Sequence, residues 1–487
     1  GDSMFAKISS LGLFGLNAFP VDVEIDISRG NPQFDIVGLP DTVVKESRER
    51  IRAALRSCSI SFPVASVMVN LAPADTRKSG SVHDMAIFMA VLEAMRLIDV
   101  PTDGCSFIGE ISLNGDIRRI NGVLPMVMLA RELGIRSVFV PNDNAAEASV
   151  IDGIDIYAVS NAEELILHFR NEKKLSPAPH FAPPDAAYNE VLDFSDVRGQ
   201  QSAKKALEIA AAGGHNALLI GSPGSGKSML AKRMPYILPE MTMEESIETT
   251  NIYSISGLLD PKHPLITKRP FRAPHHTISG VGLVGGGTIP HPGEISLAHN
   301  GLLFLDELAE FDRHPLDILR QPLEDHIVTI TRAAGTISYP CRFMLVGAMN
   351  PCPCGYYGHP SGKCHCSPDS IARYQRKISG PLLDRIDIQV SVNALRQEEL
   401  SRFAETGESS EAIASRVRKA YDIQLKRQGK PNNQLTAREI DDFCLLDESG
   451  ERLLKEAMAR LMWSARAYHR ILKISRTIAD LARTETI

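Results

Sequence analysis

The sequence has few aromatic residues and no surplus of positive charge. Only one of its 487 residues is tryptophan, so the cores must be built mainly from aliphatic side chains. Lysine and arginine number 53 against 59 aspartate and glutamate residues, which gives a formal net charge of -6. This balance excludes a histone-like coat of positive charge. It leaves open a local basic surface, because nucleic-acid binding needs only a stripe or a pore lining.

The sequence also lacks long apolar runs. None reaches the roughly 18 to 20 residues that span a bilayer, and the N-terminus lacks the basic and then apolar pattern of a secretory signal. Four of the eight cysteines lie between Cys352 and Cys366, and the others have apolar neighbours, as buried free thiols do. We therefore expect a cytoplasmic protein without membrane contact and without a disulfide framework.

The length of the sequence and a proline-rich stretch within it predict several domains. A chain of 487 residues is too long for a single core. A proline-rich stretch at 173–190 predicts a semi-rigid linker. We expect an α/β multidomain protein with an N-terminal α+β domain at 4–172, a central α/β domain at 191–395 and a helical domain at 396–487.

Hydrophobic periodicity predicts strands and helices on both sides of this linker. Before it, strands are expected at 21–27, 67–71, 117–120 and 137–140, and helices at 83–97 and 126–133. After it, strands are expected at 217–220, 301–305 and 342–348, helices at 202–212 and 228–234, and mostly helix from 398 to 481. Strands separated by helices imply a parallel sheet covered on both faces.

One segment matches the phosphate-binding motif G-x-x-x-x-G-K-[ST] in full, between an expected strand and an expected helix. Its residues are Gly221, Ser222, Pro223, Gly224, Ser225, Gly226, Lys227 and Ser228. The glycines let backbone N–H groups curl around a β-phosphate, which side chains would block. We expect Lys227 to neutralise phosphate charge and Ser228 to ligate Mg²⁺. The motif therefore predicts a site for ATP and Mg²⁺.

Two adjacent carboxylates follow the apolar run 301–305. Asp306 and Glu307 would lie at the carboxyl end of that strand, where ligands of open α/β sheets bind. Asp306 can orient the water shell of Mg²⁺, and Glu307 can polarise the attacking water as a general base. Alone, such a pair is often a solvated strand end. Beside the phosphate loop it predicts ATP hydrolysis.

Three further polar residues give weaker signals. Asn350 follows the strand expected at 342–348 and can bond the γ-phosphate or the attacking water, or else be a turn residue before a proline. Arg385 lies between apolar positions, and a surface ion pair with a neighbouring aspartate is the alternative. Arg466 lies on the C-terminal helix, where a solvated charge is the commoner case.

The crowded cysteines form two C-x-C pairs, Cys352 with Cys354 and Cys364 with Cys366. Four thiolates at a hairpin-like spacing can hold a structural Zn²⁺ tetrahedrally, although C-x-C pairs are less usual than C-x-x-C pairs. Free or reversibly oxidised thiols are the alternative. Because the cluster directly follows Asn350, a catalytic zinc is not expected.

The order of these motifs over 196–487 resembles the magnesium-chelatase-like branch of the AAA+ ATPases, and the whole chain resembles the ComM/YifB family of competence proteins. Besides the phosphate loop, the motifs that carry the resemblance are Arg-Gly-Gln at 198–200, Arg-Pro-Phe-Arg-Ala-Pro-His-His at 269–276, Pro-Gly-Glu-Ile-Ser-Leu-Ala-His at 292–299, Leu-Asp-Glu-Leu at 305–308 and Gly-Ala-Met-Asn-Pro at 347–351.

This resemblance implies roles for four residues. Asn350 falls on the sensor-1 position, Arg466 on sensor 2, and Gln200 in the segment that packs near the adenine. Arg385 falls on the arginine finger, which acts on ATP held by the neighbouring subunit. A finger given in trans implies a ring, and the family implies a homohexamer.

The N-terminal domain resembles the proteolytic domain of Lon, a fold like that of ribosomal protein S5, over 78–86 and 109–117. The resemblance places the catalytic serine on Val82 and the catalytic lysine on Leu124. A serine–lysine dyad needs both partners, so we expect the fold without peptidase activity. The family also implies one more helical segment beyond Ile487.

Two segments are candidates for contact with DNA. Residues 327–339 predict a β-hairpin that resembles the pre-sensor-1 hairpin of minichromosome-maintenance helicases. In that resemblance Arg332 faces the pore and contacts phosphate; a solvated charge or an intersubunit ion pair is the alternative. Arg269 and Arg272 lie in a basic stretch before the glycine-rich segment 280–287, which we expect to be a mobile pore loop or an intersubunit clamp.

The resemblance as a whole implies a hexameric helicase that acts on single-stranded or branched DNA. It would promote branch migration of recombination intermediates during natural transformation. A rival class is the motor subunit of a magnesium chelatase, against which the Lon-like domain argues because none is expected there. The sequence also leaves open a protein-remodelling ATPase and an ATP-dependent protease, although the missing dyad argues against the protease.

Overall fold

The computed structural model describes residues 4–101, 104–181, 192–287, 290–332, 335–393, 407–461 and 464–487. They divide into two compact units. The first contains the described residues of 1–186 together with 246–266, and the second contains those of 187–245 and 267–487. The chain thus enters the first unit twice, whereas our prediction placed 246–266 in the central domain. Half of the predicted linker, residues 182–190, and the predicted boundary at 395 lie outside the described residues.

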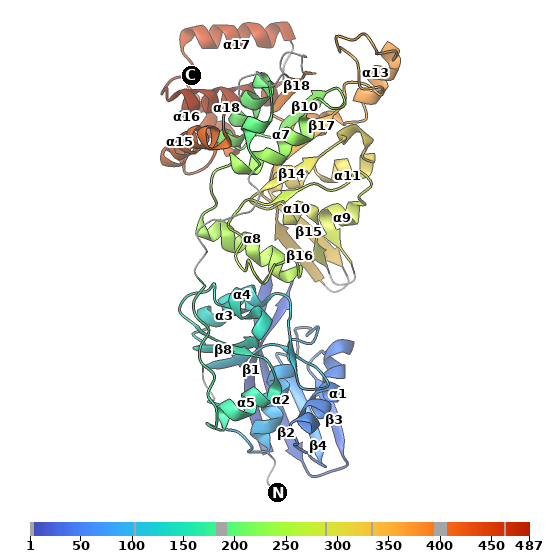
Figure 1. Ribbon diagram of the computed structural model, residues 1–487, viewed down its shortest axis with the longest axis vertical. Coiled ribbons are helices and arrows are strands. Elements are labelled where there is room, and N and C mark those ends of the chain that lie inside the picture. Colours follow the sequence, from blue (N-terminus) through green and yellow to red (C-terminus); the bar gives the residue numbers. More distant parts are fainter. Residues whose placement is uncertain are drawn as a thin grey trace. The chain divides into compact units, whose positions relative to one another are not determined.

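A seven-stranded mixed sheet organises the first unit, in the order β3-β4-β2-β1-β5-β8-β9 (Figure 1). β2 pairs antiparallel with both β1 and β4, and the other neighbours are parallel. The strands are β1 (Met4–Phe14), β2 (Asn17–Ser28), β3 (Gln33–Val37), β4 (Ser66–Ala72), β5 (Cys105–Phe107), β8 (Ser137–Pro141) and β9 (Asp155–Val159), with β6 (Glu110–Ile111) and β7 (Ile117–Arg118) as a separate pair. Antiparallel and parallel pairings in one sheet fit the expected α+β class.

The helices of the first unit are α1 (Thr42–Ser57), α2 (Asp84–Ala94), α3 (Val123–Glu132), α4 (Ala145–Ala148) and α5 (Ala162–Phe169). α2 packs on β1, β2 and α1, and its residues from Met85 to Leu92 are all inaccessible to solvent. The Lon resemblance aligns Val82 and Leu124 with the catalytic dyad. These two residues pack together in an apolar cluster that is separate from that of α2. Two apolar side chains in that cluster cannot act as nucleophile and base.

Residues 246–266 belong to the first unit because their partners lie there. They include most of α8 (Met243–Ile255). The carbonyl of Ser254 accepts from the Gly122 N–H at 3.1 Å, and its hydroxyl donates to Glu147. Arg119 donates to the carbonyl of Leu259 at 2.6 Å. These contacts join positions more than a hundred residues apart, so no local pattern predicts them.

The second unit contains a parallel sheet in the order β11-β14-β17-β10-β18. Its strands are β11 (Phe271–Arg272), β14 (Leu302–Leu305), β17 (Met344–Met349), β10 (Ala217–Gly221) and β18 (Ile388–Val392). The three strands predicted after the linker are therefore confirmed as β10, β14 and β17. In a parallel sheet all carboxyl ends meet at one edge, which is where ligands bind.

α6 (Gln201–Gly213) and α7 (Lys227–Arg233) pack against this sheet. The other helices of the second unit are α10 (Glu294–Leu297), α11 (Arg313–Ile318), α12 (Pro322–Asp325), α13 (Pro368–Gln375) and α14 (Gly380–Leu383), followed by α15 (Ser410–Gln428), α16 (Ala437–Phe443), α17 (Glu448–Leu461) and α18 (Ala465–Ala482). α6, α15 and α18 pack against one another. Of the helices that the structure describes, none is long and apolar enough to cross a membrane.

Two smaller β-pairs lie in the second unit. The predicted hairpin strands are confirmed as β15 (Ile327–Arg332) and β16 (Gly335–Pro340), with Thr329 opposite Ser338; residues 333–334 lie outside the described residues. The glycine-rich segment, which we expected to be a loop, instead forms α9 (Gly280–Val284) and β12 (Gly285–Gly286), which pairs with β13 (His291–Pro292). The Ser279 hydroxyl caps α9 by accepting from the Gly282 N–H.

Candidate active site

The phosphate loop connects β10 to α7 at the carboxyl edge of the second sheet. Gly224 and Gly226 have φ values of 76° and 96°, which L side chains rarely adopt. At Gly221 an added Cβ would lie 2.2 Å from the carbonyl oxygen of Val392, so the start of the loop is packed directly against the end of β18. The loop therefore has the backbone shape that the motif predicts.

Lys227 and Asn350 lie together at this edge. The ammonium of Lys227 donates to the carbonyls of Gly221 and Ser222 at 2.8 and 2.9 Å and to Oδ1 of Asn350 at 3.3 Å. Burial lowers the pKa of Lys227, and the carboxylates of Asp306 and Glu307 oppose that shift. The structure thus brings the predicted phosphate-binding lysine into contact with the residue at the tip of β17.

Ser228 and Asp306 are also in direct contact. The Ser228 hydroxyl donates to Oδ2 of Asp306 at 2.6 Å. A hydroxyl beside a carboxylate supplies the hard oxygen donors that Mg²⁺ prefers. The two residues predicted to hold Mg²⁺ therefore fit that ion, one from the start of α7 and the other from the end of β14.

Glu307 directly follows Asp306 and has a φ of 52°, in the left-handed region. A non-glycine residue held there costs about 1–3 kcal/mol, and such residues cluster at functional sites. Its N–H donates to Oδ1 of Asp306 at 2.9 Å, which helps to fix the backbone. Its carboxylate lies 3.4 Å from Nδ1 of His276, with the two side chains 58% and 30% exposed.

The contact of His276 with Glu307 was not predicted. We interpreted His276 only as part of a basic stretch. It follows β11, the parallel neighbour of β14, so its side chain reaches the same edge as Glu307. The available signal was the phenylalanine–arginine pair at 271–272, but a strand of two residues is too short to identify from periodicity.

Gln200 contacts the phosphate loop at Ser225. Its Nε2 donates to the carbonyl of Ser225 at 3.0 Å and to the carbonyl of Asn393 at 2.6 Å. Gln200 precedes α6 with a left-handed φ of 57°. Its side chain therefore links the phosphate loop to the end of β18, as a residue near a bound nucleotide can.

The two predicted arginines lie elsewhere in the second unit. Arg385 follows α14, forms an ion pair with Glu324, and donates to the carbonyl of Pro381 at 2.6 Å. The ion pair we considered was with an adjacent aspartate, not with Glu324. Arg466 is exposed in the first turn of α18. Within the described chain neither arginine bonds to the phosphate loop. An arginine finger that acts on the neighbouring subunit, as predicted for Arg385, does not need to do so, and the sensor-2 role of Arg466 stays a prediction.

One turn after Arg466, Arg470 holds the segment that carries Arg385. Its guanidinium donates to the carbonyl of Ile386 at 3.0 Å and, more weakly, to that of Leu383 at 3.4 Å. Sequence reasoning did not single out Arg470, because its partners lie more than eighty residues away. The contact ties α18 to the loop of the predicted arginine finger.

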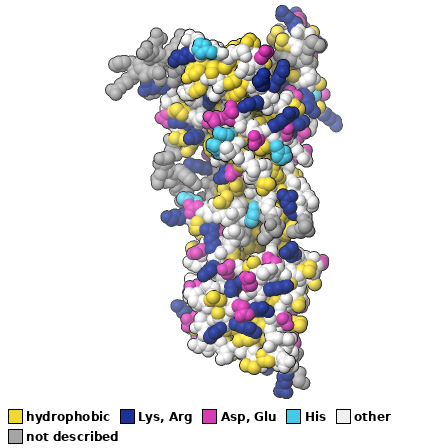
Figure 2. Space-filling model, turned by 90° about the vertical axis from the view of Figure 1, so that its right-hand side faces the viewer, with side chains coloured by type: hydrophobic (Ala, Val, Ile, Leu, Met, Phe, Trp, Pro, Cys, Tyr) yellow, Lys and Arg dark blue, Asp and Glu magenta, His cyan; other side chains and the backbone are white. Residues whose placement is uncertain are grey.

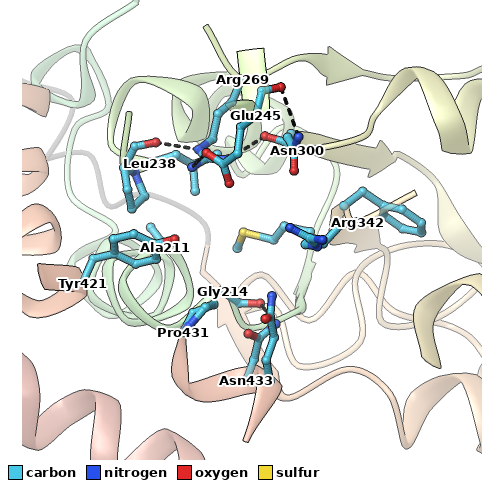
Figure 3. A pocket seen from close by; sticks show the side chains of 15 residues that line it. Ala211, Gly214, Leu238, Glu245, Arg269, Asn300, Arg342, Tyr421, Pro431 and Asn433 are labelled. Carbon is cyan, nitrogen blue, oxygen red and sulfur yellow. Dashed lines mark hydrogen bonds and ion pairs between the residues drawn. The ribbon is translucent and has the colours of Figure 1, made fainter. Parts of the chain in front are cut away.

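Two of the three DNA-contact candidates form ion pairs with acidic side chains of the same chain. Arg269 donates to the carbonyls of Pro239 and Asn300 and pairs with Glu245 at 3.1 Å, on the wall of the pocket in Figure 3. Arg272 donates two hydrogen bonds of 2.6 Å to the carboxylate of Glu294. These ion pairs fit a structural role, so we keep Arg332 as the DNA-contact candidate.

Arg332 lies at the exposed end of β15, where its guanidinium donates to the carbonyl of Thr331 at 2.9 Å. On the face shown in Figure 2, Lys and Arg side chains are interspersed with acidic ones. Positive charge therefore does not form a continuous band on that face. A DNA contact on that face would have to be local, which the composition leaves open.

The four crowded cysteines lie beside this site, in the loop between β17 and α13 (Figure 1). Their sulfur atoms all lie within 4.8 Å of one another, and His365 is not part of the group. A backbone hydrogen bond at Tyr356 lowers the pKa of Cys354 to about 6. The group can bind a metal ion.

Three family models match the chain. They describe magnesium chelatase subunit ChlI at 193–400, subunit ChlI of Mg-chelatase at 23–144, and the ChlI C-terminal region at 407–487. The match at 23–144 lies in the first unit.

Curated relatives align over nearly the whole chain. Competence protein ComM of Haemophilus influenzae is 42% identical over 486 residues, covering 99% of this chain and 95% of the relative. The uncharacterized protein YifB of Salmonella typhimurium is 40% identical over 485 residues, covering 99% and 94%. The magnesium-chelatase subunit ChlI of Olisthodiscus luteus is 27% identical over 192 residues, covering only 37% of this chain and 53% of that protein.

The phosphate loop, its carboxylate and amide partners and these matches define a magnesium-chelatase-like AAA+ ATPase, a class whose cofactors are ATP and Mg²⁺. Within that class, the chain belongs to the ComM/YifB family.

Proposed function

We propose that this protein is an ATP-driven DNA motor, a homohexameric helicase that promotes branch migration of recombination intermediates. The observation that carries the proposal is the joining of Lys227 to Asn350 and of Ser228 to Asp306 at one sheet edge, with Glu307 beside them. This is the arrangement needed to bind a triphosphate and activate water. The similarity to a competence protein over 99% of the chain supports a role in natural transformation.

Within each subunit the residues have separate tasks. Lys227 and the loop N–H groups bind the phosphates, while Ser228 and Asp306 would hold Mg²⁺, which offsets phosphate charge. Asn350 orients the γ-phosphate or the attacking water, and Glu307 accepts the proton of that water. Arg385 of one subunit and Arg466 would complete the charge stabilisation in a ring.

The hairpin of β15 and β16 would move the DNA. Arg332 lies exposed at its end, and β15 leads through β16 into β17 and so to Asn350. A change at Asn350 on hydrolysis can therefore move a phosphate contact at Arg332. In the cell such a motor would work in the cytoplasm, without membrane contact.

The experiment is ATP turnover with and without a four-way DNA junction, measured together with junction disruption. We expect stimulation by the junction and ATP-dependent strand movement, both lost in Glu307→Gln. ATPase activity that ignores DNA and leaves the junction intact would reject the motor proposal. It would favour the second candidate, a chelatase-like or protein-remodelling ATPase, whose support is the family of chelatase models.

A further inference from the structure

The loop that contains the four cysteines has almost no core of its own. Residues 351–367 form neither helix nor strand, and loops of this length without secondary structure are uncommon. All of these residues are described, and only Cys352 and Gly355 among them are buried. Burial of apolar surface therefore cannot account for the defined path of the loop, and a metal ion is the usual substitute for a core in so small a segment.

Three of the sulfur atoms have the spacing of a tetrahedral metal site, and that of Cys366 lies within 4.8 Å of them. Sγ of Cys352 lies 3.4 Å from that of Cys354 and 3.8 Å from that of Cys364, and Cys354 lies 3.7 Å from Cys364. A Zn–S bond of about 2.3 Å places sulfurs about 3.8 Å apart in a tetrahedron. Disulfide-bonded sulfurs would lie about 2.05 Å apart. The spacing thus fits zinc and not two disulfides.

The backbone around Cys352 also suits a bound thiolate. The N–H of Tyr357 donates to its sulfur at 3.3 Å, and the N–H of Gly355 donates to its carbonyl at 3.0 Å. Gly355 has a φ of 82°, which closes this turn. Hydrogen bonds to ligand atoms orient metal ligands and are a recurrent part of metal sites.

The loop is packed against the nucleotide site. Cys352 follows Asn350 by two residues, and a Cβ added at Gly355 would lie 2.6 Å from Cδ of Pro223 in the phosphate loop. Tyr357 and His359 line a cavity of about 390 Å³ together with Gly221, Ser222 and Asn393. One side of that cavity is therefore the cysteine loop and the other is the start of the phosphate loop.

We propose that Cys352, Cys354, Cys364 and Cys366 bind one Zn²⁺, and that this zinc knuckle, residues 351–367, holds Asn350 and the phosphate loop in place for ATP hydrolysis. Zinc is structural here, because four thiolates leave no open position for water. Its removal would free the chain on the C-terminal side of Asn350 and loosen the support of Pro223. The zinc site stands by itself, while its effect on hydrolysis rests on the proposed function.

The metal content of the full chain, purified under reducing conditions, tests whether the four cysteines bind zinc. We expect about one zinc per chain, as a single tetrahedral site requires, release of it by a mercurial thiol reagent, and intense visible bands of tetrahedral thiolate when Co²⁺ replaces zinc. Cys366→Ser should lose the metal, whereas Cys58→Ser, a half-buried cysteine of the first unit, should keep it. A metal-free wild type that gives no cobalt bands, or disulfides among the four cysteines, would overturn the site.

ATP turnover of the same proteins tests whether the bound zinc supports ATP hydrolysis. Cys366→Ser, or wild type stripped by a chelator, should hydrolyse ATP about 10- to 100-fold more slowly, because small misplacements of positioning groups cost up to about 100-fold. Adding zinc back to the stripped wild type should restore the rate, which separates this effect from unfolding. Hydrolysis at the wild-type rate without zinc would overturn the coupling.

Lys227→Ala separates the two proposals. It should keep its zinc while losing nucleotide binding. Zinc-loaded wild type without ATPase activity would reject the proposed function and the coupling but leave the zinc site standing. Loss of zinc from Lys227→Ala, together with an unchanged circular dichroism spectrum, would contradict the independence of the metal site.

Discussion

Nδ1 of His276 lies 3.4 Å from Oε2 of Glu307, so the predicted general base touches a side chain from the neighbouring strand end. β11 and β14 are parallel neighbours, and each residue follows its strand at the same edge. A carboxylate engaged by an imidazole has one oxygen fewer for the attacking water. The contact therefore restrains the group that must polarise water.

Removing this contact should release Glu307. We expect His276→Ala to raise ATP turnover without DNA by a few-fold and to reduce the stimulation by DNA. Steady-state phosphate release with and without a DNA junction measures both effects. His263→Ala, an exposed histidine of the first unit, is the control and should change neither rate. If His276→Ala behaves like that control, the contact has no role in turnover.

Glu307→Gln should keep nucleotide binding and slow hydrolysis by about 10²- to 10⁴-fold, which is the usual contribution of a general base. The amide preserves the side-chain volume but cannot accept the proton. Binding of a fluorescent ATP analogue and single-turnover hydrolysis separate the two steps. Glu310→Gln, three residues on and 45% exposed, should hydrolyse normally. Normal hydrolysis by Glu307→Gln would remove it from the site.

Lys227→Ala should weaken ATP binding strongly, because within the described chain the loop would lose the one cation that bonds to the carbonyls of Gly221 and Ser222. We expect turnover to fall by at least about 100-fold, as for other preorganised charge contacts. The control is Lys232→Ala, an exposed lysine of the same helix. Equal turnover in the two variants would contradict the role of Lys227.

Arg385→Ala tests the contact in trans. We expect retained nucleotide binding and a loss of hydrolysis of about 10³-fold or more, as for arginine fingers. Mixing it with Lys227→Ala should restore part of the activity, since one variant supplies the site and the other the finger. Arg376→Ala, an exposed arginine at the end of α13, should hydrolyse normally. No recovery in any mixture would argue against a finger supplied by the neighbour.

Arg332→Ala should leave turnover without DNA unchanged and abolish strand movement. A lost phosphate contact should also reduce the slope of log affinity against log salt by about 1. Arg313→Ala, with a side chain that is 82% exposed, tests whether any surface arginine has this effect. Normal junction disruption by Arg332→Ala would exclude it as a translocating contact.

Sequence alone brought the expected nucleotide-site residues together, because they carry a motif or follow an apolar strand. Lys227 was predicted from the phosphate-binding motif, and Asp306 and Asn350 from their places directly after or near the end of an expected strand; in the structure Lys227 bonds to Asn350 and Ser228 bonds to Asp306. β1 was missed because serine and glycine interrupt its alternation. The pairing of Arg269 with Glu245 and the contact of His276 with Glu307 depend on which segments become neighbours in the fold. Local periodicity carries no such information.

Because residues 246–266 belong to the first unit, the segment that codes for them lies between two segments that code for the second unit. A single cut at the proline-rich stretch yields neither unit whole: the N-terminal fragment lacks Ser254 and Leu259, and the C-terminal fragment keeps them without Gly122 and Arg119. A single crossover at that stretch would therefore combine most of the first unit from one relative with residues 246–266 from the other.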